Sequence, residues 1–196
     1  MGRTKAAAFP YYDTMRVLNI GVGKIGVSES LENLPSEGVD AALIALNEEV
    51  DFSSEIRGRS TFSVRAAAVS QRLSYPILIG CKTKYGEIRH LSVMTFSHGE
   101  LSDIADRTLN LGGGFYEGDK IKVLRLKRFN AGLLVDTDVL LYRNWQKLAP
   151  HCSVVFSVGL SGEKAELDFI PRFSEKFGKP YVVVYADGTL LWGNPK

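Results

Sequence analysis

The chain has few of the residues that mark a secreted or membrane-spanning protein. Two cysteines in 196 residues, Cys81 and Cys152, are too few for a disulfide framework and favour a reducing compartment. Both lie in strand-like apolar stretches, which is typical of core residues. No apolar run approaches the ~20 residues that a membrane-spanning helix needs, and the first residues lack the apolar stretch of a secretory signal. We therefore predict a cytoplasmic protein without membrane contact.

The sequence also has no large excess of positive or negative charge. The 24 Lys and Arg residues are nearly balanced by 22 Asp and Glu residues, leaving a net charge of +2. A nucleic-acid partner would require a concentrated basic patch. The most basic run, Lys120–Arg128, alternates charged with apolar residues, as one solvated face of a strand would. The three histidines, His90, His98 and His151, have no metal-ligand spacing. We predict no nucleic-acid partner, no metal and no cofactor.

The residues that are present suit one globular domain. A hydrophobic fraction of 45% over 196 residues is enough to bury a core. We expect a loose N-terminal segment over residues 1–14 and a single α/β domain over residues 15–196. Apolar runs predict buried strands at Arg16–Gly21 and Ala41–Leu46. Ser60 is the expected cap of a helix that ends near Pro76.

Runs of β-forming residues separated by glycine-containing turns predict hairpins in the middle of the chain. Gly86 and Gly99 stand where a turn favours positive φ. They separate three expected strands, Tyr75–Cys81, Ile88–Phe96 and Leu101–Arg107. A helix around Glu163–Phe177, whose Pro171 should kink it or set its start, and a final hairpin complete the predicted elements.

The segment from Gly118 to Gly159 is the most informative part of the sequence. An apolar strand, Ala131–Val135, leads into the acidic elbow Asp136-Thr137-Asp138. An amphipathic helix, Val139–Leu148, and another buried strand, Ser153–Val158, are expected to follow. An elbow between a strand and a helix is where many α/β hydrolases present a nucleophile.

This elbow resembles that of the nitrilase family of carbon–nitrogen hydrolases. GLLVDTD stands where that family usually has GVLICYD, so Asp136 lies in the place of the catalytic cysteine. Thr108, with Arg107 beside it, lies in the place of the lysine that holds the oxyanion. Strict counting puts Leu46 at the end of the strand that carries the general base, with Glu48 just beyond. The resemblance implies a nitrilase-like α-β-β-α sandwich with mixed sheets and hairpins, in which all three catalytic residues are replaced.

The resemblance also implies an assembly. Subunits of that family pair through helices next to the elbow strand. For this chain a homodimer is therefore expected, with its interface near the apolar residues of the Val139–Leu148 segment: Leu140, Leu141, Trp145 and Leu148.

Several roles are open for the acidic elbow. Aspartate is a weak nucleophile whose attack on an amide would give a high-energy anhydride, and carboxylates succeed mainly against good leaving groups. Asp136 could instead cap the following helix, or bind a cation with Asp138 and Glu48. Arg107 could pair with either acid or lie exposed at a strand end. We therefore predict a divergent nitrilase-like protein without thioester chemistry that serves binding or assembly, with a small-molecule ligand compatible with that role.

Two alternatives to this function follow from the residues. The first is an amide or nitrile hydrolase that uses a rearranged acidic site. The second is a nucleotide-binding domain, because Gly21–Gly26 reads G-x-G-x-x-G after a strand, with Glu48 about twenty residues further on. Pro35 and the hairpins that follow break the βαβ rhythm that this second alternative requires.

Overall fold

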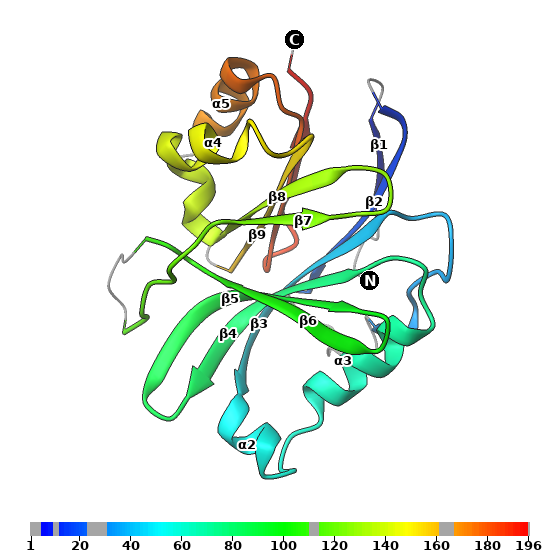
Figure 1. Ribbon diagram of the computed structural model, residues 1–196, viewed down its shortest axis with the longest axis vertical. Coiled ribbons are helices and arrows are strands. Elements are labelled where there is room, and N and C mark those ends of the chain that lie inside the picture. The colour runs from blue at the N-terminus through cyan, green and yellow to red at the C-terminus, as the bar shows by residue number, and fades with distance from the viewer. Residues whose placement is uncertain (1–4, 10–11, 23–30, 110–113, 161–166, 196) are drawn as a thin grey trace.

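Two mixed β-sheets stacked face to face form the centre of the protein in a computed structural model (Figure 1). The structure describes residues 5–9, 12–22, 31–109, 114–160 and 167–195. One helical layer covers each outer face (Figure 1). The predicted α-β-β-α order of layers is confirmed.

The first sheet contains six strands in the order of the sequence. Within it, β2, β3 and β4 are parallel, whereas β1, β5 and β6 join by antiparallel pairing. The predicted N-terminal segment 1–14 contains β1 and the beginning of β2. The strands of this sheet are β1 (Lys5–Phe9), β2 (Tyr12–Val22), β3 (Ala41–Asp51), β4 (Ile77–Tyr85), β5 (Ile88–Ser97) and β6 (Glu100–Asp106).

The second sheet has five strands, in the order β11-β10-β9-β8-β7. Its three central strands are parallel and its two edges are antiparallel. Both sheets thus differ from the all-parallel, doubly wound sheet on which the nucleotide-binding alternative depends. The strands are β7 (Lys122–Arg125), β8 (Asn130–Val135), β9 (Val154–Gly159), β10 (Tyr181–Tyr185) and β11 (Leu190–Gly193).

The helices divide between the two outer faces. Helices α2 (Phe52–Ile56) and α3 (Phe62–Gln71) lie on the first sheet, and α4 (Tyr142–Leu148) and α5 (Phe169–Phe177) lie on the second (Figure 1). Pro171 is in the first turn of α5, where its missing N–H costs no helical hydrogen bond. No helix within the described ranges is long and apolar enough to cross a membrane.

The start of α3 corrects the expected role of Ser60. The helix begins at Phe62, and its N-cap residue is Thr61. Ser60 lies one residue earlier: its Oγ accepts the N–H of Phe62 at a long 3.4 Å, and its hydroxyl donates to Glu55. The Glu55 carboxylate accepts the backbone N–H groups of Phe62 and Ser63, at 3.0 and 3.1 Å. A carboxylate from the preceding helix therefore satisfies two of the free N–H groups at the start of α3.

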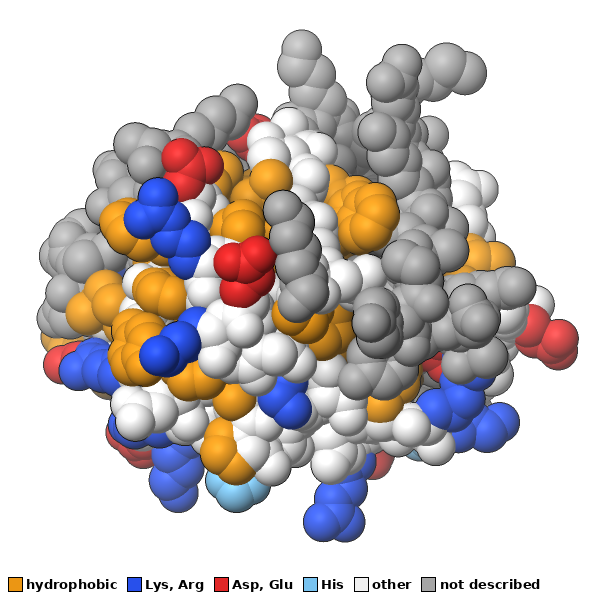
Figure 2. All heavy atoms as spheres, turned by 90° about the horizontal axis from the view of Figure 1, so that it is seen from above, with side chains coloured by type: hydrophobic (Ala, Val, Ile, Leu, Met, Phe, Trp, Pro, Cys, Tyr) orange, Lys and Arg blue, Asp and Glu red, His pale blue; other side chains and the backbone are white. Residues whose placement is uncertain are grey.

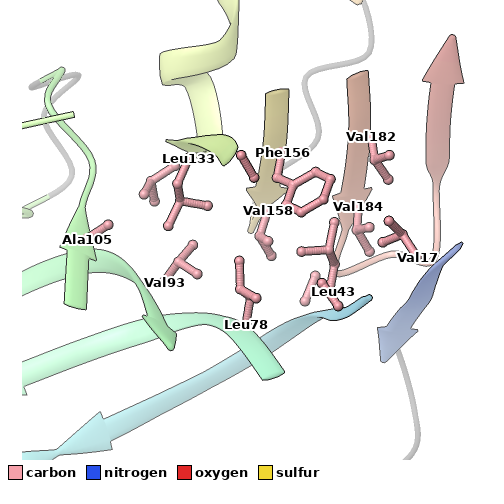
Figure 3. Close-up of a cluster of buried hydrophobic side chains, with 14 of the residues drawn as sticks. Val17, Leu43, Leu78, Val93, Ala105, Leu133, Phe156, Val158, Val182 and Val184 are labelled. Atoms are coloured by element: carbon pink, nitrogen blue, oxygen red, sulfur yellow. The ribbon is translucent and has the colours of Figure 1, made fainter. Parts of the chain in front are cut away.

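The main core lies between the sheets. Side chains such as Leu43, Leu78 and Val93 from the first sheet meet Phe156 and Val158 from the second (Figure 3). The sheets approach closely at Gly80, where an added Cβ would lie 2.3 Å from Cγ1 of Val158. Glycine at this position lets the sheets reach native packing density.

Candidate functional site at the strand–helix elbow

Asp136 directly follows β8 and has a strained backbone. Its φ of 53° lies in the left-handed region, which aspartate and asparagine tolerate better than most residues. The residue is only 1% exposed. The chain therefore makes a sharp turn that holds a carboxylate inside the protein.

Two groups from different elements hold this carboxylate. Nη1 of Arg107, just past β6, donates to Oδ2 of Asp136 at 3.3 Å, and the side chain of Arg107 is 6% exposed. The backbone N–H of Leu160, just past β9, donates to Oδ1 at 2.9 Å. Arg107 therefore forms a buried ion pair with Asp136, which was one of the alternatives, and does not lie exposed at a strand end. The pair links the first sheet to the second.

The interpretation of Asp136 as a helix cap is wrong, and so are the bounds of the expected helix. Residues Asp136–Leu140 form a 3₁₀ turn, η1, and α4 begins only at Tyr142, with no side-chain cap on either element. Leu141 between them is extended. The indole N–H of Trp145 donates to the carbonyl of Val139 at 2.7 Å, which satisfies a carbonyl that a continuous helix would have used.

Thr108 contacts the second acid of the elbow. Its N–H and hydroxyl donate to the two oxygens of Asp138 at 2.8 and 2.9 Å. Burial raises the pKa of Asp138 and outweighs the opposing effects of the Thr108 hydrogen bonds and of the Arg107 charge. The predicted site residues Asp136, Arg107 and Thr108 therefore gather with Asp138 in one buried polar cluster.

Glu48 does not join this cluster. It is exposed in β3, at an irregularity where the pairing with β4 passes from Ala45 to Glu49. Its neighbour Glu49 pairs with Arg89 at 3.1 Å. Among the described residues, no hydrogen bond or ion pair joins Glu48 to Asp136. Within the same residues, no group of three or more His, Cys, Asp or Glu side chains is placed to hold a metal ion.

The thiols lie away from the elbow. Cys81 is fully buried on the face of β4 that packs under α3, and burial raises its pKa to about 12. Cys152 is buried beside α4, and burial raises its pKa as well. A raised pKa opposes formation of the thiolate that nucleophilic attack requires. Both cysteines are core residues in this structure.

The Leu160 contact could not be predicted from the sequence. Every residue except proline has a backbone N–H, so the residue type at position 160 does not indicate a hydrogen bond to Asp136. The glycine motif begins in β2 with Gly21, and its residues 23–26 lie outside the described residues.

Comparison with known proteins identifies this architecture. No family model matches the sequence, and no curated protein matches it. Solved structures do match. A variant of the Nesterenkonia AN1 amidase from the nitrilase superfamily superposes with a TM-score of 0.68 at 13% identity, covering 93% of this chain and 87% of that one.

The same amidase in complex with butyramide gives a TM-score of 0.68 at 14% identity, covering 95% of this chain and 89% of the other. A further structure carries the acetamide moiety of fluoroacetamide at its active-site cysteine and matches with a TM-score of 0.67 at 15% identity, covering 91% and 80%. These likenesses confirm that the chain has the predicted nitrilase-like fold.

Proposed function

We propose that this chain is a divergent nitrilase-like protein without cysteine thioester chemistry, and that it serves binding or assembly. The observation that carries the proposal is the engagement of Asp136. Each of its oxygens accepts a hydrogen bond from a buried group, Arg107 or Leu160. A carboxylate held in this way stabilises the elbow, and its attack on an amide would lead to an unfavourable anhydride.

The hydrogen bonds of Thr108, which lies in the place of the family's lysine, support the same proposal. An amide hydrolase needs a donor or cation aimed at the developing oxyanion. Thr108 directs both its N–H and its hydroxyl to Asp138 instead. The Arg107 guanidinium beside it is paired with Asp136. The cytoplasmic location that we predict from the two cysteines is part of this proposal.

One observation favours the alternative, a carbon–nitrogen hydrolase with an acidic site. Because burial raises the pKa of Asp138, this carboxyl holds a proton more readily than an exposed aspartate. Two carboxyls in different environments can divide the roles of acid and base. Asp136 and Asp138 would then act on a substrate that displaces the present hydrogen bonds.

Ammonia release from simple amides and nitriles separates these functions. We expect no release above buffer for acetamide, butyramide, benzamide or benzonitrile, because no thiolate is present at the elbow. Asp138→Asn, which preserves the shape of the side chain, provides the control. Turnover by the wild type that disappears in a folded Asp138→Asn protein would establish the hydrolase alternative.

We propose that the protein forms a homodimer, but with other interface residues than the sequence predicted. Trp145 and Leu148, expected near the interface, are 0% and 2% exposed because they fill the space between α4 and the second sheet. The large hydrophobic side chains left at the surface of the α4–α5 layer are Tyr142 and Phe169, each 45% exposed. Figure 2 shows hydrophobic side chains among Lys and Arg at the end of the molecule that carries α5.

Light scattering measures this assembly directly. The chain has a mass of 21.6 kDa, so a dimer of two such chains should have about twice that mass, since closed two-fold pairing is the commonest assembly. Phe169→Ser should shift the population toward the monomer. Ile56→Ser is the matched control, because Ile56 is 76% exposed on the opposite helical layer. A wild-type mass of one chain at tens of micromolar (~50 μM, a concentration at which a stable interface stays associated) would refute the homodimer.

A further inference from the structure

A hollow of about 1070 Å³ opens at the end of the sandwich opposite the elbow. It lies where β3 and β4 begin and where the turn between β7 and β8 covers them. Strand β8 separates it from Asp136, and its six residues span about 20 Å at ~3.3 Å per residue. The hollow is therefore distinct from the buried polar cluster of the elbow.

The walls of the hollow combine an apolar floor with a basic rim. Leu124 and Leu126 from the β7–β8 hairpin contribute apolar surface, and both pack against the core between the sheets. Three cations of the same hairpin, Arg125, Lys127 and Arg128, line the hollow as well. An apolar surface with a few convergent polar groups is typical of a small-molecule site.

The charges at the rim are unevenly balanced. Asp40 is the one carboxylate of the lining, and it makes a two-point pair with Arg128 at 2.9 and 2.6 Å. Arg125 and Lys127 are exposed, and among the described residues neither has an acidic partner. Three cations thus face one carboxylate, and the surplus positive charge attracts an anion.

A buried hydroxyl gives an independent sign of a ligand. Thr95 lines the hollow near the end of β5 and is 5% exposed. Strand alternation puts it on the same face as Leu91 and Val93, toward the second sheet. Its Oγ1 has no hydrogen-bond partner in the described part of the chain. Buried hydroxyls in native structures nearly always have a partner, so a polar ligand atom would complete this one.

We propose that this hollow binds a small amphipathic organic anion. Its carboxylate or phosphate group pairs with Arg125 and Lys127, its apolar part lies on Leu124 and Leu126, and a polar atom reaches Thr95. Carboxylates and phosphates share the charge and the acceptor oxygens that guanidinium and ammonium groups recognise. This site is separate from the elbow, so the inference does not depend on whether the elbow is catalytic.

Amide-resolved NMR titrations test the site with 6-hydroxyhexanoate, 6-hydroxyhexyl phosphate and neutral 1,6-hexanediol, whose terminal hydroxyl supplies the polar atom for Thr95. We expect saturable shifts at Thr95 and residues 124–128 with a dissociation constant of ~1 mM or tighter for at least one anion. The anion that binds more tightly identifies the head group. 1,6-Hexanediol should bind at least ~10-fold more weakly, because it lacks the charge that the rim recognises.

Two variants and a matched control assign the contacts. Arg125→Gln with Lys127→Gln should weaken the binding of the anion at least ~10-fold, and Thr95→Val should weaken it ~3- to 10-fold. Arg143→Gln with Lys147→Gln removes the same charges from the exposed face of α4 and should leave the affinity unchanged. Equal binding of 1,6-hexanediol, full affinity in the Arg125/Lys127 variant, or the absence of saturable shifts in the hollow would overturn the proposal.

Discussion

Asp136→Asn is expected to lower the free energy of unfolding by about 3–5 kcal/mol, because it leaves the buried Arg107 without its acid. Asparagine tolerates a positive φ as well as aspartate does, so the backbone strain stays the same. The amide oxygen can still accept from the N–H of Leu160. The substitution therefore isolates the loss of charge, which urea unfolding monitored by circular dichroism measures.

Asp138→Asn is the matched control two residues away. Burial raises the folded pKa of Asp138 above the ordinary aspartate value of 3.8, so the stability linked to its protonated form is present below that value. This stability is lost as the pH rises through the folded pKa. We expect a cost of no more than about 1–2 kcal/mol, which becomes smaller as the pH rises above about 4.

The two variants together decide the role of the ion pair. If Asp136→Asn costs no more than Asp138→Asn at neutral pH, Arg107 does not depend on Asp136. An Arg107→Met, Asp136→Asn double variant should recover part of the loss, since the buried charge is then gone as well.

Trp145→Ala should also cost about 3–5 kcal/mol, as large-to-small changes in a packed core do. Trp145 is fully buried. Its ring stacks on that of Phe177, with centroids 6.5 Å apart, and lies 6.1 Å from that of Phe173. It therefore holds α4 against α5, while its indole N–H satisfies the carbonyl of Val139 at the end of the elbow.

Trp192→Ala provides the comparison for this prediction. Trp192 is 47% exposed in the edge strand β11, so its loss should cost about 1 kcal/mol or less. Urea unfolding of both variants gives the two values. A loss in Trp145→Ala that does not exceed the loss in Trp192→Ala would show that α4 does not depend on this packing.

Local sequence signals predicted much of the fold. Gly86 and Gly99 have the positive φ values of 61° and 87° that their turns require, and the strands around them pair antiparallel as expected. These turns and pairings depend on neighbours in the sequence, so the sequence contains enough information to predict them. The α-β-β-α layers were predicted from the order of elements and from the resemblance of the elbow to the nitrilase family.

The site depended on contacts that the sequence does not encode locally. Arg107 and Asp136 are 29 residues apart, and their pairing became visible only once β6 and β8 had been placed in facing sheets. The break at Leu141 was not predicted, since the surrounding residues have a pattern typical of a helix. Hydrogen bonds from the side chains of Asn144 and Trp145 to backbone carbonyls stabilise this break. The basic hairpin at Lys120–Arg128 was interpreted as a solvated strand face, since nothing in its own residues shows the hollow beside it.

The division of the strands between the sheets has a consequence for folding. Every strand of the first sheet precedes Lys122, and every strand of the second follows Asp106, so the described chain passes from one sheet to the other once. Each half can complete its own pairings before the two apolar faces meet, and the Arg107–Asp136 pair forms only at that docking step. A chain cut between β6 and β7 would thus yield two fragments that each hold a whole sheet and need the other to cover it.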